Sequence, residues 1–270
     1  MDENLLSALH NLCEAMGNDP TYIQLPKTEA EEQKLMIDAY NAKQGNLTGY
    51  ECSKCKNRGD FLAYSDNEQV FVKCECMNIR DSIDRLKRAQ INVNRYTFEN
   101  YTTEQQWRQH IKATAKKFVS SSKHWFFIGG QNGCGKTHIC TAIALELIKQ
   151  GKELRYMKWK DEGTRLKALV NDADRYGELI EPYKTAAVLY VDDFFKTDKR
   201  TSPTAGDINV AFEILDARYN NELITIISSE RTVDDIIDVD SAVGGRIKEM
   251  CGDNFCLNVP KDAKKDYRIR

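Results

Sequence analysis

Residues 130–137 read GQNGCGKT and follow directly on the apolar run HWFFIG at 124–129. A loop that wraps the phosphates of a nucleotide must point several backbone N–H groups inward, and glycine permits the dihedral angles and the close approach that this requires. The positive end of a following helix faces the same phosphates, Lys136 adds a charge, and the Thr137 hydroxyl is placed to bind Mg²⁺. With a strand predicted before the loop and a helix after it, the motif predicts a nucleoside triphosphate site.

The residues expected to bind the nucleotide form an almost continuous segment. Cys134 lies inside the loop and is interpreted as a small filler and not as a nucleophile. The full set is Gly130, Asn132, Gly133, Cys134, Gly135, Lys136, Thr137 and His138.

The second part of the site is predicted at the end of the apolar run AAVLYVDD, residues 186–193. In open α/β sheets, ligands bind at the carboxyl ends of the strands. Asp192 is expected to hold Mg²⁺ through water, and Asp193 is expected to act as a catalytic residue that polarises the attacking water. Two aspartates at a strand end are common by themselves, but their position about 55 residues after Lys136 makes them a strong second signal.

The composition limits the class of protein. The chain has 270 residues, of which 41% are hydrophobic and 30% charged, and its formal net charge is −2. This is an ordinary globular mixture, so contact with nucleic acid has to come from a local basic patch. No apolar run approaches the roughly 18 to 20 residues that cross a bilayer, and the acidic N-terminus lacks the basic segment of a secretory signal. We therefore expect a cytoplasmic protein without a membrane partner.

Strand patterns alternate with helical patterns from about residue 96 onward, which predicts a parallel sheet with right-handed crossovers. The expected fold class is α/β, with a five-stranded parallel sheet flanked by helices and a small N-terminal zinc-binding module. The strands are predicted at 124–129, 154–159, 186–193, 223–229 and 255–259, and the helices at 101–121, 136–150 and 207–220.

Four cysteines in the first third of the chain have the spacing of a metal site. Cys52, Cys55, Cys74 and Cys76 form C-x2-C-x18-C-x-C, with KNRGD as a tight turn after the first pair and QVFVK as a strand before the second. Four thiolates on two such turns suit tetrahedral Zn²⁺, which would also supply folding energy to a module too small for its own core. An iron–sulfur cluster and a disulfide pair are weaker alternatives, because nothing indicates a redox partner and cysteines without an export signal are typical of a reducing compartment.

Two helical patterns flank this module. Residues 4–17 place Leu5, Leu9 and Leu12 on one face, which could dock on its own domain or bind a partner. Residues 77–91 form a second amphipathic pattern, whose polar face is basic.

The paired phosphate-loop and aspartate motifs, with their spacing, resemble those of the AAA+ ATPases. The resemblance is closest to the DnaC/IstB-like branch, which contains bacterial and phage helicase loaders and transposition ATPases. It runs from about residue 50 to the C-terminus and includes EILDARYNNELITI at 213–226, AVGGRIKEM at 242–250 and DYRIR at the end. The chain ends soon after the fifth predicted strand, so we expect no separate helical lid domain.

This resemblance implies further site residues. The strand LITIISS would carry a polar sensor residue, either Ser228 or Ser229. AVGGRIKEM would carry an arginine finger at Arg246, whose rigid guanidinium fits the transition-state charge on the nucleotide of a neighbouring subunit. Arg268 would touch nucleotide or DNA. ATP as the nucleotide also follows from the resemblance, since the sequence contains no base-reading motif.

The resemblance further implies contact with single-stranded DNA. In this branch the segment after the second strand faces a central channel, where aromatic rings stack on bases and lysines meet phosphates. This assigns DNA contacts to Tyr156, Lys158, Trp159 and Lys160, with a core role for Trp159 as the competing interpretation. The basic residues between 80 and 123 are more simply a solvated helix face.

The leading hypothesis is an ATP-dependent loader of a hexameric replicative DNA helicase. By resemblance, residues 1–90 would dock on the helicase, and residues 91–270 would form the AAA+ ATPase domain. Loader and helicase would assemble as a ring or spiral on single-stranded DNA, and slow ATP hydrolysis would release the loader. The alternatives are a transposase-helper ATPase that binds duplex DNA and a nucleotide-gated adaptor with negligible hydrolysis, with a simple kinase as a weaker one.

Overall fold

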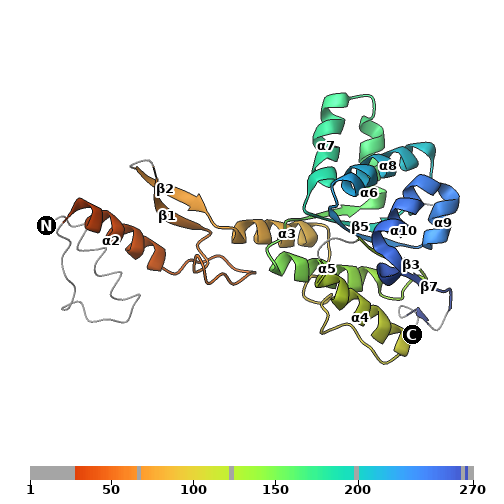
Figure 1. Ribbon diagram of the computed structural model, residues 1–270, viewed down its shortest axis with the longest axis horizontal. Coiled ribbons are helices and arrows are strands. Elements are labelled where there is room, and N and C mark those ends of the chain that lie inside the picture. The colour runs from red at the N-terminus through yellow and green to blue at the C-terminus, as the bar shows by residue number, and fades with distance from the viewer. Residues whose placement is uncertain (1–27, 66–67, 122–124, 198–200, 263–264, 267–270) are drawn as a thin grey trace. The chain divides into compact units, whose positions relative to one another are not determined.

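The computed structural model describes residues 28–65, 68–121, 125–197, 201–262 and 265–266. The helix predicted for residues 4–17 and the terminal Arg268 lie outside these residues. The chain folds into two compact units, Met1–Arg80 and Asp81–Arg270 (Figure 1). Helix α3, Cys76–Arg88, begins in the first unit and ends in the second.

The first unit contains helix α2, Glu29–Ala42, and a two-stranded antiparallel sheet of β1, Asp60–Ser65, and β2, Glu68–Lys73. The register of this hairpin pairs Asp60 with Lys73. The sequence pattern predicted β2 as the strand QVFVK, but it predicted neither β1 nor α2.

Helix α2 is defined by local hydrogen bonds. It starts with a capping box, in which the Glu31 N–H donates to Thr28 Oγ1 and the Thr28 N–H donates to Glu31 Oε2, both at 3.2 Å. Its last turn is attached to β1, because Asn41 donates to the Leu62 carbonyl at 2.9 Å and accepts from the Leu62 N–H at 3.0 Å. A helix held in this way needs no broad apolar stripe, so hydrophobic periodicity does not reveal it.

The second unit is built on a five-stranded sheet in the order β4-β5-β6-β3-β7, and its neighbouring strands are all parallel. The strands are β3 (Trp125–Gly130), β4 (Leu154–Lys158), β5 (Val188–Phe194), β6 (Ile224–Ser229) and β7 (Cys256–Val259). The predicted α/β class with a five-stranded parallel sheet is confirmed. Because the strands are parallel, the carboxyl ends of β3, β5 and β6 meet at one edge of the sheet.

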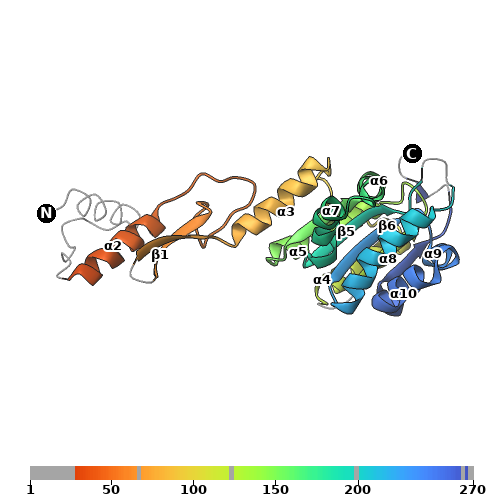
Figure 2. The ribbon, with the colours of Figure 1, turned by 90° about the horizontal axis from the view of Figure 1, so that it is seen from above.

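Helices pack on both faces of this sheet (Figure 2). The right-handed crossover from β3 to β4 puts α5 on one face together with α4, and the crossovers that return toward β7 put the later helices on the other. The helices are α4 (Gln106–Val119), α5 (Lys136–Lys149), α6 (Trp159–Leu169), α7 (Ala173–Thr185), α8 (Ala205–Asn220), α9 (Val233–Val239) and α10 (Ser241–Phe255).

Burial explains which of these elements the sequence revealed. Every residue of β3 and β6 is buried, and β3 appears in the sequence as a continuous apolar run, whereas β6 includes the buried polar residues Thr225, Ser228 and Ser229. Helices α4, α5 and α8 correspond to predicted helices, whereas α6, α7, α9 and α10 were not predicted as helices. Helix α7 buries only Ile180 and Tyr183, which is too few apolar positions to mark a periodic stripe.

A buried cation connects three elements of the second unit. Arg218 on α8 is fully buried, and its guanidinium donates to the carbonyls of Tyr183 at 2.9 Å, Ala186 at 2.9 Å and Ile224 at 2.6 Å. Burial lowers the pKa of Arg218 to about 9. These bonds join α8 to the end of α7 and the start of β6, and they satisfy carbonyls that would otherwise be buried without a donor.

The described residues after β7, at 260–262 and 265–266, form no α-helix. Nor does any helix in the described part of the chain combine the length and apolar character that crossing a membrane demands.

Candidate functional site

The phosphate loop joins the buried strand β3 to helix α5. Gly130 has a φ of +101°, and a Cβ at this position would lie 2.1 Å from the Val259 carbonyl oxygen, so a larger residue does not fit. Gly135 has a φ of +95° and caps α5, which begins at Lys136. The positive end of the helix dipole therefore lies at the loop, as an anion-binding site requires.

Lys136 is enclosed by the loop that precedes it. Its side chain is buried, and Nζ donates to the carbonyls of Gly130 at 2.9 Å and Gln131 at 2.8 Å. Burial lowers the pKa of Lys136. The neighbouring Cys134 is buried as well, and burial raises the pKa of its thiol. A neutral, enclosed thiol fills space in the loop and is a poor nucleophile.

His138 supports the wall of the site. Its Nε2 lies 2.9 Å from the Thr97 carbonyl oxygen, and its ring packs against Tyr96 and Tyr101 with centroids 5.2 and 5.1 Å away. Burial lowers the pKa of His138, which favours the neutral ring. The side chain thus ties the segment before α4 to the first turn of α5.

Asp192 lies at the centre of a hydroxyl cluster. Its buried carboxylate accepts hydrogen bonds from Tyr190 at 2.9 Å, Tyr156 at 3.1 Å and Thr137 at 3.3 Å, and from Ser228. Burial and the Asp192 charge raise the pKa of Tyr156 and of Tyr190. The sequence prediction brought Thr137 and Asp192 together, and it could also have found Tyr190, because residues two apart in a strand share a face.

Asp193 occupies a different environment one residue later. Its φ is +55°, at an irregularity in the pairing of β5 with β6, and its N–H donates to Ser228 Oγ at 3.0 Å. Its Oδ2 accepts from Lys196 Nζ at 2.8 Å, and the same Nζ lies 3.0 Å from Glu230 Oε1. The carboxylate that was predicted to polarise water is therefore paired with a lysine that the sequence analysis did not single out.

A cavity of about 510 Å³ lies at the phosphate loop, and its lining includes Lys136, Thr137 and Asp193 but not Asp192. On one side it is lined by phosphate-loop residues and on another by Asp193, Lys196 and Glu230. The remaining wall comes from the segment before α4 and from α4 itself, through Arg95, Tyr96, Asn100, Thr102 and Arg108.

Arg108 is the residue of this wall whose position differs most clearly from the prediction. It was counted in a basic run that was interpreted as a solvated face, but it is 5% exposed and lies against Tyr101, 4.4 Å from the ring centroid. The signal was present, because Arg108 shares its helix face with Ile111, Ala115 and Phe118, all buried. A buried cation beside a phosphate loop adds to the positive potential of the cavity.

The two sensor candidates differ in their surroundings. Ser228 contacts both Asp192 and the Asp193 N–H, whereas the Ser229 hydroxyl donates to the Phe194 carbonyl at 2.8 Å. Arg246 does not line the cavity of its own chain. Its Nη2 donates to Asp216 at 2.6 Å, and its guanidinium lies over the Phe212 ring, 4.6 Å from the centroid.

The predicted DNA contacts require one correction. Trp159 is 3% exposed and packs edge-on against Phe194 and Phe195, with centroids 4.8 and 5.4 Å away. Its assignment as a base-stacking residue is wrong, because the aromatic residues after β5 enclose the ring. Tyr156 is also directed inward, toward Asp192, while Lys158 and Lys160 are exposed.

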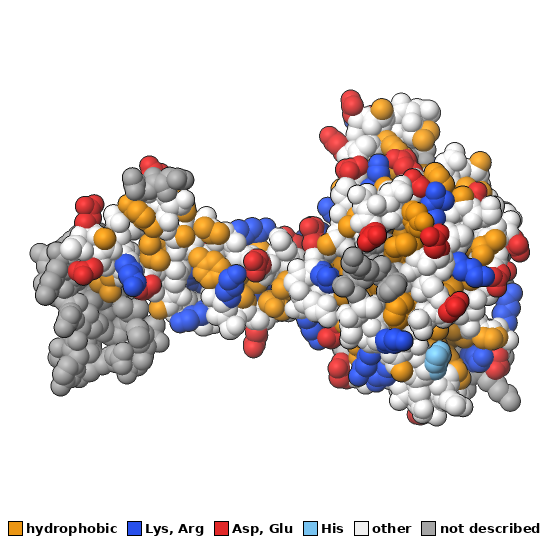
Figure 3. Space-filling model, in the orientation of Figure 1, with side chains coloured by type: hydrophobic (Ala, Val, Ile, Leu, Met, Phe, Trp, Pro, Cys, Tyr) orange, Lys and Arg blue, Asp and Glu red, His pale blue; other side chains and the backbone are white. Residues whose placement is uncertain are grey.

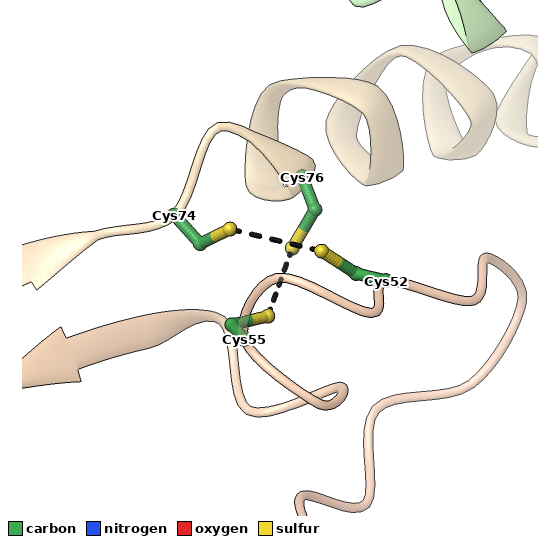
Figure 4. A group of neighbouring side chains, drawn as sticks. All are labelled: Cys52, Cys55, Cys74 and Cys76. Carbon is green, nitrogen blue, oxygen red and sulfur yellow. Dashed lines mark hydrogen bonds between the residues drawn. The ribbon is translucent and has the colours of Figure 1, made fainter. Parts of the chain in front are cut away.

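The four predicted metal-binding cysteines meet at one point of the first unit (Figure 4). Their Sγ atoms all lie within 4.8 Å of one another, with Cys52 and Cys74 3.8 Å apart and Cys55 and Cys76 3.5 Å apart. Four thiolates at 2.3 Å from a tetrahedral Zn²⁺ would be about 3.8 Å apart, so the donor set fits that ion.

The backbone around the cysteines is shaped for metal binding. The Cys52 N–H donates to Asn57 Oδ1 at 2.8 Å, and the Gly59 N–H donates to Cys55 Sγ at 3.3 Å. Burial would raise the pKa of Cys55, but the Gly59 N–H and the neighbouring thiols lower it to about 6. Arg80 is buried and donates to the Tyr50 carbonyl at 2.6 Å, which attaches α3 to the first cysteine loop.

The loop, the paired aspartates and the parallel sheet define a P-loop protein that binds a nucleoside triphosphate. The profile described as IstB-like ATP binding protein matches residues 62–239. The chain belongs to this family of IstB/DnaC-like AAA+ ATPases.

The chain is also similar to individual proteins, two by sequence and one by structure. The phage-like element PBSX protein XkdC of Bacillus subtilis is 30% identical over 79% of this chain and 84% of its own length. The uncharacterized protein YqaM of the same organism is 36% identical, but the match covers 47% of this chain and 41% of YqaM. A crystal structure of the DnaC helicase loader has the same fold, with a TM-score of 0.51 and 22% identity over 62% of this chain and 99% of that one.

Proposed function

We propose that this protein is an ATP-dependent loader of the replicative DNA helicase onto single-stranded DNA during replication initiation. The observation that carries the proposal is the shared fold with the DnaC helicase loader, which is covered over 99% of its length, in a chain that places a four-cysteine unit before its phosphate loop. The AAA+ core would supply the nucleotide switch, and the cysteine unit would supply a rigid contact for the helicase.

The proposed chemistry uses residues that meet at the carboxyl ends of β3, β5 and β6. Lys136 and the first turn of α5 bind the phosphates of ATP, and Asp193 orients the attacking water. Thr137 and Asp192 would hold Mg²⁺, which would supply positive charge to offset that of the phosphates. Ser228 positions both aspartates through its hydroxyl.

The second nucleotide contact comes from another subunit. Arg246 is assigned as the finger that reaches the γ-phosphate bound by a neighbouring copy, which requires it to leave Asp216. This supports faster hydrolysis within an assembly, in keeping with a ring or spiral formed together with the helicase. Hydrolysis is then slow in the isolated chain and rises on assembly.

The helicase contact is assigned to residues 1–90, with Zn²⁺ as the structural ion at the four cysteines. The hairpin β1–β2 presents apolar side chains to solvent, with Phe71 67%, Val72 47% and Tyr64 44% exposed. Exposed apolar groups of this size on a short hairpin are typical of a protein contact surface. DNA contact is assigned to Lys158 and Lys160, because both side chains are exposed and can meet phosphates. On the face seen in Figure 3, basic and acidic side chains are interspersed.

The proposal is tested by the native mass of the full chain mixed with the hexameric replicative helicase, with and without a non-hydrolysable ATP analogue. A defined complex is expected, and Phe71→Ser should weaken it. Val170→Ser is the matched control, because Val170 is 61% exposed on the second unit. A helicase that binds neither the wild type nor the control would contradict the loader function.

A second candidate is a transposase-helper ATPase, which rests on the resemblance to the IstB-like branch and on the match to the IstB-like ATP binding protein profile. Such a protein would assemble on duplex DNA in the presence of ATP and would bind a transposase. Self-assembly on duplex DNA without any helicase complex, in the same native-mass experiment, would select this function.

A further inference from the structure

A second cavity of about 290 Å³ lies in the second unit. Its lining includes Lys160 and Lys167 of α6, Lys196 after β5, and hydroxyl groups such as those of Thr164 and Ser202. Among the described residues of the lining, the one carboxylate, Asp207, pairs with Lys167. The charged side chains of these described residues sum to positive, and hydroxyl donors surround them, which is the chemistry that binds a phosphate group.

Lys196 lines both this cavity and the one at the phosphate loop. Its Nζ lies 2.8 Å from Asp193 Oδ2 and 3.0 Å from Glu230 Oε1, and the side chain is 38% exposed. Burial would lower the pKa of Lys196, but the bonds to Asp193 and Glu230 raise it, so the ammonium is charged at neutral pH. The same ammonium group thus pairs with the Asp193 carboxylate at the first cavity and is available to an anion at the second.

The backbone that leads into Lys196 is restrained. Asp193 and Phe195 have φ values of +55° and +56°, and the Lys196 N–H donates to the Asp193 carbonyl at 3.0 Å. Phe194 and Phe195 are stacked, and Trp159 packs against both. Because this aromatic cluster holds the turn, the flexible stem of Lys196 is the part best able to move between the cavities.

We propose that the second cavity binds a phosphate group, and that Lys196 is the switch through which this binding releases Asp193 for ATP hydrolysis. When Lys196 is paired with Asp193, the ammonium occupies the Oδ2 that the attacking water would use. A phosphate group in the second cavity competes for the same ammonium, and Asp193 is then open to water. The inference rests on the proposed hydrolysis at the first cavity and does not depend on the helicase.

The phosphate group has two sources, the backbone of a nucleic-acid strand and free inorganic phosphate. Lys160 lies in the second cavity and in the segment assigned to single-stranded DNA. A strand held there would couple DNA binding to ATP turnover within one subunit, through Lys196 alone.

The test is steady-state ATP hydrolysis by the full chain, without addition, with a single-stranded oligodeoxynucleotide and with inorganic phosphate. Lys196→Met should raise the basal rate at least about tenfold, a part of the 10²–10⁴ that a positioned base contributes, and should abolish further stimulation. Lys196→Arg should restore a low basal rate and the response to the oligonucleotide. Lys149→Met is the control, since Lys149 pairs with Glu146 and lines neither cavity.

The two ligands identify the source of the phosphate. Stimulation of the wild type by the oligonucleotide alone assigns the cavity to a strand, and equal stimulation by inorganic phosphate assigns it to the free anion. Lys160→Met should increase the oligonucleotide concentration needed for half-maximal stimulation. A wild type that responds to neither ligand overturns the inference.

Lys196→Met also overturns the inference if it lowers hydrolysis or leaves it unchanged while binding of a fluorescent ATP analogue stays normal. The native mass with helicase is measured on the same variants. Loss of the helicase complex with the expected rise in hydrolysis would overturn the loader function and leave the Lys196 switch intact.

Discussion

The two units of this chain bury their interiors by different means. In the second unit, whole strands such as β3 and β6 are buried between layers of helices. In the first unit, three of the four clustered cysteines form the buried cluster themselves, with Tyr50, Phe61 and Met77 against it. Strand β2 of that unit buries none of its side chains fully. The comparison teaches that hydrophobic burial accounts for the second unit, whereas the first unit buries so little that the ion proposed at its cysteines would have to supply folding energy.

Removal of the ion should have the largest effect and should be confined to the first unit. Structural Zn²⁺ contributes an apparent ~10–16 kcal/mol to small domains of this kind, so Cys55→Ser or chelation should unfold the hairpin. Amide hydrogen exchange and metal content measure this, with Cys256→Ser in the second unit as the control. Slow exchange in the hairpin of a metal-free chain would contradict a metal-dependent first unit.

A substitution at Asp193 should affect the second unit alone, because it removes a catalytic group without changing the fold of either unit. Asp193→Asn should lower ATP hydrolysis by about 10²–10⁴-fold, the range of general-base contributions, while binding of an ATP analogue is kept. Asp234→Asn, at an exposed position of the same unit, serves as the control. Wild-type turnover as low as that of Asp193→Asn would favour the adaptor hypothesis.

Arg218→Met should show how far the second unit depends on polar groups inside its hydrophobic core. The substitution leaves the carbonyls of Tyr183, Ala186 and Ile224 without this donor, and each buried unpaired group costs roughly 1–3 kcal/mol. We expect a loss of about 3 kcal/mol in the free energy of unfolding in urea. Arg165→Met, on an exposed ion pair, should change it by less than about 0.5 kcal/mol. Equal losses of unfolding free energy in both variants would mean that the buried bonds of Arg218 do not stabilise the fold more than an exposed ion pair does.

The smallest expected effect is on the pH dependence of stability, through the ion pair between Lys196 and Glu230. Burial would raise the pKa of Glu230, but its bond to Lys196 lowers it from 4.5. A carboxyl whose folded pKa is lowered stabilises the fold above its ordinary pKa, and this contribution is lost as the pH falls below about 4.5. Glu230→Gln should flatten the acid side of a stability profile of the second unit. A profile identical to that of the wild type would mean that the ion pair does not stabilise the fold.

Much of the site could be predicted because it depends on short motifs whose context is local. GQNGCGKT between an apolar strand and a helix, and the aspartates that end the apolar strand at 188–194, determine the positions of Lys136, Thr137 and Asp192. Two cysteine pairs with the spacing of metal ligands likewise determine the thiol cluster. In each case the backbone near the functional group carries the information.

The remaining parts of the site depend on contacts between distant segments. Lys196 follows the second aspartate by three residues, yet its partner Glu230 comes from the end of β6. Arg108 looked like a surface cation, and Trp159 looked like a base-stacking ring, until the packing of α4 and of Phe194 and Phe195 showed both to be buried. Burial of a polar or aromatic side chain depends on what packs over it, which periodicity alone does not specify.

The sequence by itself determined that this chain has a P-loop core with a parallel sheet and a separate four-cysteine site. It did so because glycine conformation, strand burial and metal-ligand spacing are local constraints on the backbone. Only the tertiary structure decided that Asp192 is surrounded by hydroxyl groups, whereas Asp193 is paired with a lysine that faces two cavities. Adjacent residues at an irregular strand end point to different neighbours, and the fold alone brings those neighbours together.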